Sequence, residues 1–486
     1  MEYAPPAAAG GAYCCLRNRG MEEEMTTPRK TTTRDMTAGS IVKQIVLFSL
    51  PLMLGNIFQM LYNTVDTLVV GNYVGTEALA AVGSTTIIVN MAVFFFNGFS
   101  VGAGVVISHY FGEKNMRELH RAVETTILMT FLLSALFTVA GVLTVRPMLR
   151  FMATPEDVFQ DAVTYLTIYF AGISGLLVYN MGSGILRAVG DSTRPLIFLI
   201  ITSLLNIALD LLFVLVFRMG IAGVAVATIL AQFTSAAMVL ILLTRTEDIY
   251  RLSWRDLCLD GKILKRTFAV GLPAGIQSVI TAFSNVFVQG YINSFGSACM
   301  AGWSCYNKLD TFIMLPMQSM AMAATTFVSQ NLGAKKRKRA YRGAWVTIGM
   351  SVGVTALVAT FLYIFAEPSV GLFTADHSVI SFGALFIRTN VFFLLFNCVN
   401  HVMASALRGE GDSRGPMIVM LIAFVGIRQI YLFVLTRFII NVPKWVGFGY
   451  PVGWTCCFIL MIAYWVWRHG APWKQTGSLT NEEVPS

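Results

Sequence analysis

Four polar residues interrupt segments that are otherwise apolar, and together they carry oxygens of the kind that bind a small cation. Asn206 and Asp210 are four residues apart and share one face of a helix, while Asp66 and Thr228 lie in other apolar segments. Two carboxylates with amide and hydroxyl oxygens suit a hard cation such as sodium, and crowded carboxylates also suit a proton carrier. These residue types leave a sodium site, a proton site and a purely structural hydrogen-bond network open.

The segment that contains Asp66 carries a polar stripe. Asn56, Gln59 and Asn63 precede Asp66 at steps of three, four and three residues, which places all four on one side of a helix. Pro51 comes before the stripe and has no amide hydrogen to donate to the preceding turn. The sequence therefore predicts a bend in this helix at Pro51.

The elements that position these residues are predicted to be membrane-spanning helices. Of the 486 residues, 56% are hydrophobic and 13% charged, with a mean hydropathy of +0.66, whereas soluble domains carry about 25% charged residues. Apolar runs of about 20 residues match the length of helix that crosses a bilayer. We predict an all-α polytopic membrane protein with twelve transmembrane helices, near residues 44–71, 79–110, 121–145, 161–186, 195–217, 221–243, 268–294, 298–331, 343–366, 379–407, 417–439 and 446–467.

The spans divide into two six-helix bundles. We predict a disordered cytoplasmic tail over 1–40, an N-terminal lobe over 41–243, a cytoplasmic linker over 244–267, a C-terminal lobe over 268–468 and a cytoplasmic tail over 469–486. Twenty-seven of the 35 Lys and Arg residues fall in the termini and in the loops on one side of the spans, and five fall in the other loops. The positive-inside rule therefore predicts that both termini lie in the cytoplasm, and we expect a multi-pass protein of the plasma (inner) membrane.

An internal repeat relates the two bundles. The segment 186–195 (LRAVGDSTRP) recurs as 407–416 (LRGEGDSRGP), with six of ten positions identical at an offset of 221. Gly112 and Gly333 match at the same offset. Because each repeat contains an even number of spans, both bundles have the same orientation. This predicts a pseudo-twofold axis along the membrane normal, with the substrate path between the bundles.

The two halves differ in their charges. The positions that correspond to Asp66 and Asp210 in the second half carry no carboxylate, so the candidate ion site belongs to the first half. The helix that corresponds to the first span keeps a polar stripe at Gln277, Thr281, Asn285 and Gln289. The residues that we predict to line the cavity are Asn56, Gln59 and Asn63 of the first half and Gln277, Asn285 and Gln289 of the second.

The second half has its own intramembrane charges. A charge within a span costs roughly 3 kcal/mol or more, so each such residue is a functional candidate. Lys308 and Asp310 are two residues apart and do not face each other on a straight helix. Arg388 and Arg428 lie in later spans. Structural pairing between helices is the leading interpretation of this set, and selection of substrate charge is the alternative.

The chain lacks the motifs that other classes of function require. There is no Gly-x-x-x-x-Gly-Lys-Ser/Thr loop, no nucleophile–base arrangement and no His/Cys metal cluster, so we expect neither an enzyme nor a cofactor. The basic run 335–339 mimics a nucleic-acid patch. In a short loop beside spans, it is better explained as orienting the protein and contacting anionic lipid.

These motifs together resemble the MATE (multidrug and toxic compound extrusion) family of the MOP flippase superfamily, over about residues 40–468. The resemblance rests on the twelve spans in parallel halves and on four motifs: Ser-Leu-Pro at 49–51, Val-Asp-Thr at 65–67, Gly-Ala-Gly at 102–104, and Leu-Arg-x-x-Gly-Asp-Ser at 186–192 and 407–413. It implies efflux of cationic, amphipathic compounds in exchange for sodium or protons, through a V-shaped cavity that faces each side in turn.

The resemblance also implies roles for single residues. It places the family's first-half cation site, with sodium as one possible ion, at Asp66, Asn206, Asp210 and Thr228, and the bend of the first helix at Pro51. One branch of the family has acidic residues in spans 7 and 10. This chain has none there, so it resembles the branch that couples ions in the first half.

Two rival functions remain open. A flippase for lipid-linked oligosaccharides, from the same superfamily, would need cationic residues on the cavity wall, which Lys308, Arg388 and Arg428 would have to supply. A channel would permit flux without exchange, which the doubled architecture with one buried acid pair does not favour. The expected partners are the lipid bilayer and small cationic organic molecules, without nucleic acid, and the chain is expected to act as a monomer.

Overall fold

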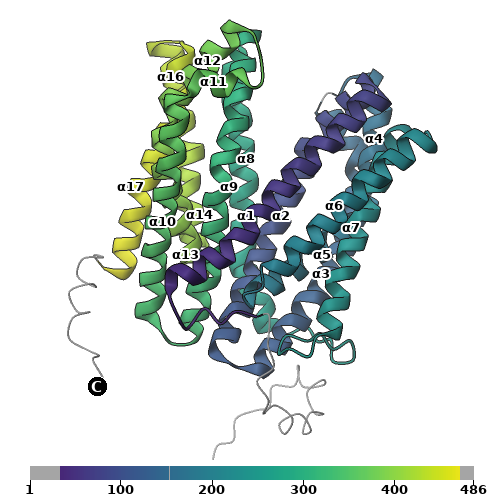
Figure 1. The fold of residues 1–486 in the computed structure, drawn as a ribbon, viewed down its shortest axis with the longest axis vertical. Helices are drawn as coiled ribbons and strands as arrows, with labels where there is room; N and C mark the ends of the chain where they lie inside the picture. Colours follow the sequence, from purple (N-terminus) through teal and green to yellow (C-terminus); the bar gives the residue numbers. More distant parts are fainter. Residues whose placement is uncertain (1–32, 153, 471–486) are drawn as a thin grey trace, which may run out of the picture.

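The computed structural model describes residues 33–152 and 154–470, which form two bundles of helices joined near one end (Figure 1). The predicted tails over 1–32 and 471–486 lie outside the described residues. We call the bundle before residue 246 the N-terminal lobe and the bundle after residue 260 the C-terminal lobe. The inner end of both is the end at which α1 begins and α2 and α9 finish, and the opposite end is the outer end.

The N-terminal lobe consists of α1 (Ile41–Val69), η1 (Val70–Val74), α2 (Thr76–Glu113), α3 (Met116–Phe151), α4 (Glu156–Ala171), α5 (Ile173–Ala188), α6 (Thr193–Leu211), η2 (Leu212–Val216) and α7 (Gly220–Arg245). The C-terminal lobe consists of α8 (Gly261–Asn293), α9 (Ser297–Gly333), α10 (Arg337–Ile364), α11 (Ala366–Gly371), α12 (His377–Asn390), η3 (Val391–Phe393), α13 (Leu394–Gly409), α14 (Arg414–Leu421), η4 (Ile422–Ile427), α15 (Arg428–Val434), η5 (Leu435–Ile439), α16 (Pro443–Gly447) and α17 (Gly449–His469).

The prediction of an all-helical polytopic membrane protein is confirmed. Within the described residues, eleven helical segments are long and apolar enough to cross a bilayer. The count reaches twelve when α4 and α5 are taken together as one span, which is bent by 47° at the break between them. The sequence predicts one continuous span there. The break falls at Gly172, where an added Cβ would lie 2.5 Å from Ile229 of α7, so a larger residue would collide with that helix.

One span begins earlier than its hydropathy predicts. α8 begins at Gly261, although the apolar run begins at residue 268. The carboxylate of Asp260 caps the helix by accepting hydrogen bonds from the backbone amides of Lys262 and Ile263, at 2.8 and 3.2 Å. The added turns carry charged side chains, which hydropathy assigns to a loop even though they are helical.

The repeated Leu-Arg-x-x-Gly-Asp-Ser segments form the same turn in both lobes. Gly190 and Gly411 have φ values of 87° and 89°, a left-handed conformation that glycine adopts without strain. The next residue in each turn, Asp191 or Asp412, donates its backbone amide at 2.9 Å to the leucine that begins the motif. The sequence repeat is therefore a repeat of local structure, and it joins corresponding helices in the two lobes.

The lobes touch most closely where α2 of one crosses α8 of the other. Each helix carries a Gly-x-x-x-Gly motif at the crossing, Gly98 with Gly102 and Gly271 with Gly275. A Cβ on Gly98 would collide with the backbone of Gly275, and a Cβ on Gly102 would lie 2.5 Å from the carbonyl oxygen of Thr267. Small residues let the two backbones pack directly against each other, as in other membrane helix pairs.

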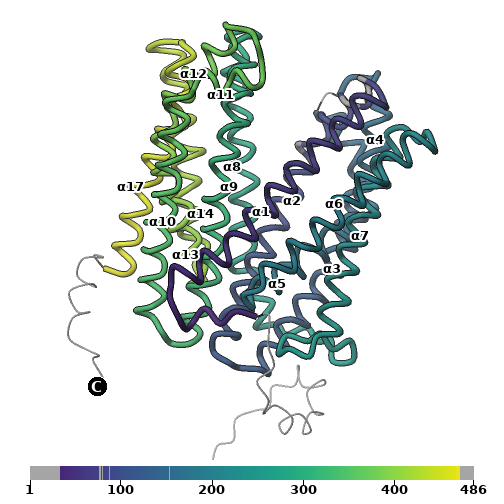
Figure 2. Tube along the Cα trace, viewed as in Figure 1, coloured from purple at the N-terminus to yellow at the C-terminus, as the bar shows by residue number. Residues whose placement is uncertain are grey.

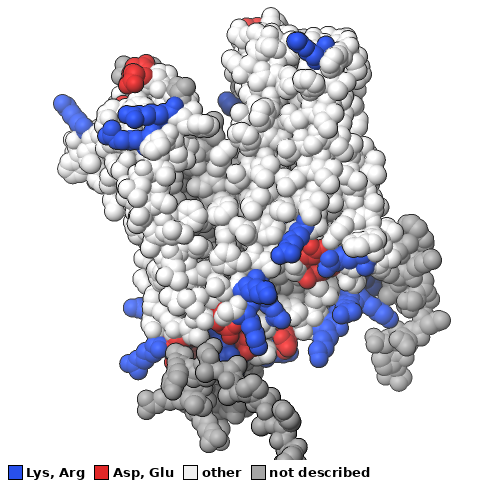
Figure 3. Space-filling model, turned by 180° about the vertical axis from the view of Figure 1, so that it is seen from behind, with Lys and Arg blue, Asp and Glu red and all other residues white. Residues whose placement is uncertain are grey.

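The lobes diverge toward the outer end, where α4 and the pair α11 and α12 are far apart (Figures 1 and 2). In the space-filling view this divergence is an open cleft with largely uncharged walls (Figure 3). On the face shown, Lys and Arg gather at the inner end, with smaller groups at the outer tips. The molecule therefore has the V shape that the sequence resemblance implies, open at its outer end.

The first described residues correct one prediction. Residues 36–39 form turns between the lobes and are not disordered, although the sequence predicts a disordered tail as far as residue 40. The side chain of Met36 is fully buried. A short polar segment with one apolar residue carries no helix or strand pattern, so its order depends on the surface that it meets.

Candidate ion-coupling site and central cleft

Asp66 of α1 and Asp210 of α6 face each other inside the N-terminal lobe. Their carboxyl groups lie within hydrogen-bonding reach of each other. Each has a buried oxygen, Oδ1, that accepts no hydrogen bond within the described part of the chain. Asp210 is fully buried, whereas Asp66 is half-buried. Two carboxylates this close repel each other in a low-dielectric interior, so a proton or a cation between them lowers their energy.

Asn206 and Thr228 complete the cluster that the sequence singles out. In the amide orientation that satisfies both neighbours, Asn206 Nδ2 donates to Asp210 Oδ2 at 2.9 Å. Asn206 Oδ1 then accepts from the backbone amide of Thr228 at 3.2 Å. The Thr228 hydroxyl donates to the carbonyl oxygen of Val224 at 3.0 Å, which leaves its lone pairs free to accept. The structure therefore brings all four predicted residues together from α1, α6 and α7.

Three tyrosines that our sequence reasoning missed surround this cluster. The hydroxyl of Tyr62 is within hydrogen-bonding reach of the Thr228 side chain, and Tyr165 of α4 lies close to both carboxylates. Tyr169 stacks on Tyr165 with ring centroids 6.3 Å apart. A signal was present for Tyr62, which comes four residues before Asp66 on the same helical face. Tyr165 and Tyr169 gave none, because aromatic residues are common in apolar spans.

The polar stripe of α1 joins this cluster to the opposite lobe. Asn56 Nδ2 donates to Ser319 Oγ of α9 at 3.4 Å, while Gln59 and Asn63 are exposed. Pro51 lies within α1, which continues as one helix from Ile41 to Val69 without a break there. The helix that carries Asp66 therefore also contacts the C-terminal lobe.

The polar stripe of the second half is only partly exposed. Asn285 is exposed, and Gln289 donates to Asn293 Oδ1 of its own helix at 2.7 Å. The prediction that Gln277 lines the cavity is wrong. Its side chain is 6% exposed, and it accepts a hydrogen bond from Arg408 at 2.9 Å. Helical spacing puts Gln277 on the stripe, but the packing of α8 against the C-terminal lobe covers that turn.

The four charges of the second half do not form one group. Arg388 pairs with Glu367 of α11 at 3.2 Å, as structural pairing predicts. Lys308 is exposed and lies 5.4 Å from the ring of Phe373. Neither Asp310 nor Lys308 has an ion pair within the described residues, contrary to that prediction.

Arg428 is also without an ion pair in the part of the chain that the structure describes. It is 2% exposed, and its guanidinium donates to Ser284 Oγ at 2.7 Å. The guanidinium carbon lies 5.0 Å from the ring centroid of Tyr450, which adds a cation–π contact. Its environment is therefore the interior of the C-terminal lobe.

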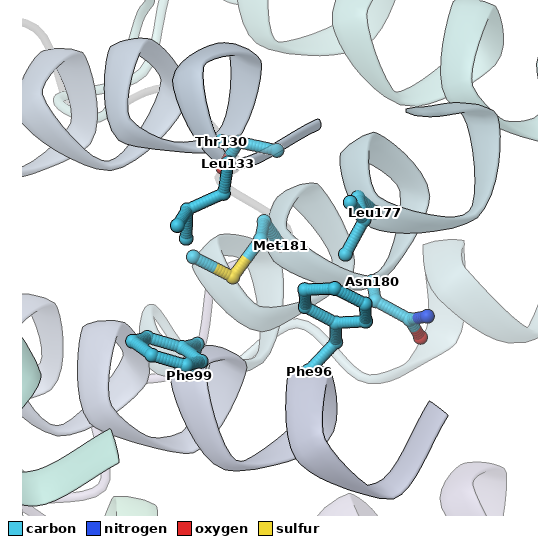
Figure 4. A pocket seen from close by; sticks show the side chains of 7 residues that line it. All are labelled: Phe96, Phe99, Thr130, Leu133, Leu177, Asn180 and Met181. Atoms are coloured by element: carbon cyan, nitrogen blue, oxygen red, sulfur yellow. The ribbon is translucent and has the colours of Figure 1, made fainter. Parts of the chain in front are cut away.

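A small cavity inside the N-terminal lobe has too little room for an organic substrate. Its volume is about 10 Å³, which is room for about one water molecule. It is lined mainly by apolar and aromatic side chains, with the amide of Asn180 as one of its polar groups (Figure 4): Phe96, Phe99, Thr130, Leu133, Leu177, Asn180 and Met181. A drug-sized molecule needs a site of about 300 Å³ or more, so the open cleft between the lobes is the candidate substrate site.

A family profile and several known proteins match this chain along most of its length. The sequence profile of the MatE family matches this chain twice, over residues 51–212 and 273–434, which are the two halves of the repeat. A Bacillus subtilis protein described as "Probable multidrug resistance protein YpnP" is 30% identical over 445 residues, which cover 90% of this chain and 97% of that protein. "Probable multidrug resistance protein NorM" of Thermotoga maritima is 24% identical, over 91% of this chain and 96% of that protein.

Solved structures share the fold. A crystal structure described as MATE in the bent conformation superposes with a TM-score of 0.84 at 22% identity, over 91% of this chain and 98% of that one. An outward-facing multidrug resistance MATE transporter of the MOP superfamily also gives 0.84, at 21% identity, over 93% of this chain and 99% of that one. With the family profile matching both halves, the chain belongs to the MatE family of multi-pass membrane transporters and is not an enzyme.

Proposed function

We propose that this protein is a secondary active multidrug exporter that exchanges sodium or protons for cationic, amphipathic organic compounds by alternating access. The observation that carries the proposal is the carboxylate pair, Asp66 and Asp210, buried in one lobe beside a cleft that opens at the outer end. Relatives described as multidrug resistance proteins match along nearly their whole length, which supports the class of cargo.

In this mechanism a proton or sodium ion entering between Asp66 and Asp210 removes their repulsion and lets α1 pack more closely on α6 and α7. The stripe through Asn56 carries this movement to Ser319 of the other lobe. Ion binding thereby changes the shape of the cleft wall and releases cargo to the outer side. Loss of the ion to the inner side resets the site.

The packing of α1 suits a moving part. The crossing of α2 with α8 is lined by four glycines. The crossing that corresponds to it in the repeat, that of α1 with α9, involves the larger residues Ser319 and Ala323. A π-helical segment, η1, follows Asp66 within four residues, and another, η2, follows Asp210 within two. π-Helical segments are frequent at functional sites. The backbone beside both carboxylates is therefore irregular, while the α2–α8 contact is tight.

The charge distribution supports a plasma membrane protein with its inner end in the cytoplasm, because Lys and Arg gather there. Both walls of the cleft come from one chain, which supports a functional monomer. A lipid-linked oligosaccharide flippase receives less support. Of the three cations that it would need, Arg428 is buried within its lobe and Arg388 is paired with Glu367, which leaves Lys308 as the one that is exposed and has no ion pair within the described residues.

A reconstituted transport assay tests the proposal and identifies the ion. Purified protein in liposomes, loaded with a fluorescent organic cation, is given an imposed sodium gradient or an imposed proton gradient. We expect one gradient to drive cargo movement at least tenfold faster than no gradient, since exchange links the two fluxes. Equal flux with and without both gradients would indicate a passive pathway and would contradict exchange.

A further inference from the structure

A short segment before α1, residues 36–39, lies between the inner ends of the two lobes, and we call it the strap. Its carbonyl oxygens are bound by the C-terminal lobe. Lys336 Nζ donates to Thr37 O at 2.9 Å, and an Arg339 guanidinium nitrogen donates to Ala38 O at 3.0 Å and Gly39 O at 2.8 Å. Two residues of the basic run 335–339 thus bind the strap, which the composition of that run does not predict.

The side chain of Met36 anchors the strap in an apolar cluster that both lobes build. Met36 is fully buried, and it packs in a cluster with Ile45 and Phe48 of α1 and with Ala323 and Phe327 of α9. An unbranched thioether side chain suits such a junction because it fills irregular gaps between helices. Because burial of apolar surface is favourable, this contact favours the closed inner end.

Gln330 of α9 joins the strap to both lobes. Its side chain is fully buried, with Oε1 accepting from the backbone amide of Met36 at 3.0 Å. Its Nε2 donates to the carbonyl oxygen of Ala188 at the end of α5, in the N-terminal lobe, at 2.9 Å. Asn331, the next residue, donates to Met36 O at 3.2 Å. One amide therefore connects three separate segments.

The strap covers the place where α2 and α9 meet. A Cβ on Gly112 of α2 would collide with the carbonyl of Gln330, and a Cβ on Gly333 of α9 would collide with the carbonyl of His109. Gly112 corresponds to Gly333, and His109 to Gln330, at the repeat offset, so this contact lies about the pseudo-twofold axis. Alternating access requires these helix ends to separate when the inner end opens.

We propose that the strap is an intramolecular latch that holds the inner end closed, with Gln330 as the side chain that ties it to both lobes. The inference rests on the proposed alternating-access function. Opening of the inner end must break the Gln330–Ala188 bond or release the strap from Lys336 and Arg339. The latch therefore stabilises the conformation seen here, and weakening it shifts the population toward an open inner end.

The test measures how accessible the contact between α2 and α9 is at the inner end. Ser329 of α9 is fully buried in this contact, and its hydroxyl donates to Val105 O of α2 at 2.7 Å. The variant Ser329→Cys, made in a background without the other cysteines, therefore places a thiol of similar size there. Its labelling rate is measured with a membrane-impermeant maleimide in inside-out vesicles, without substrate or gradient. We expect the thiol to be labelled about tenfold faster than in the parent protein when Lys336→Gln and Arg339→Gln are combined. We expect the same for Met36→Ala, which weakens the latch without changing a charge.

The matched control is Lys335→Gln/Lys338→Gln, which removes the same charge from the same run at two exposed positions. We expect its labelling rate to stay within about twofold of the parent. Equal acceleration in the control and the latch variants, or unchanged labelling in Met36→Ala, would overturn the proposal. The labelling measurement does not require transport, so it tests the latch separately from the exchange function. Faster labelling of the latch variants together with ion-independent flux would support the latch and contradict the proposed exchange.

Discussion

Replacing Asp66 or Asp210 with Asn is expected to abolish ion-driven export while the protein still folds and reaches the membrane. Asn keeps the shape of the side chain but can neither take up a proton nor supply the negative charge that a sodium ion needs. Coupling between two ligands is typically worth about 1–3 kcal/mol, or about 5- to 150-fold in affinity. We expect gradient-driven export to fall by about 100-fold in either variant, measured as the initial rate in liposomes.

Binding of the cargo should survive these substitutions, because the carboxylates lie inside the lobe rather than across the cleft. Cargo affinity measured by fluorescence polarisation in detergent is expected to change by less than about fivefold. Asp161→Asn, on the same helix as Tyr165, is the matched control and is expected to export normally. Full export by both Asp66→Asn and Asp210→Asn would show that the pair is a structural network and not the coupling site.

Enlarging the glycines at the α2–α8 crossing is expected to be the most damaging change outside the ion site. A Cβ on Gly98 meets the backbone of Gly275, and backbone cannot move aside as a flexible side chain can. Overpacking a well-packed core typically costs about 1–3 kcal/mol. We expect Gly98→Ala to lower the thermal unfolding midpoint in detergent by several degrees, and Gly98→Leu to prevent recovery of monodisperse protein.

The same helix supplies the control. Gly83 of α2 has open space where a Cβ would be added, with nothing within 4 Å. Because alanine is favoured over glycine in a helix by about 1 kcal/mol, Gly83→Ala is expected to leave the midpoint unchanged or slightly raised. Equal losses at the two positions would mean that glycine matters in α2 for its flexibility and not for the contact between lobes.

Much of this protein was determined by features that the sequence displays locally. The membrane-spanning helices follow from runs of apolar side chains, because a lipid environment requires helices of about 20 residues. The two parallel lobes follow from the repeat at offset 221, and the cost of polar and charged groups inside a span marks Asp66, Asn206 and Asp210 as candidate site residues. These signals depend on the order of residues along the chain, so identifying them requires no knowledge of how the helices pack.

Only the tertiary structure decided which of these residues meet, and what covers them. Gln277 has the helical spacing of a cavity residue but is buried against Arg408, and the basic residues Lys336 and Arg339 bind backbone carbonyls from nearly 300 positions earlier. The need for glycine at the four positions of the crossing becomes evident only when the two lobes are placed together. Such contacts depend on the angle and depth at which distant helices pack, and periodicity within one helix carries no information about either.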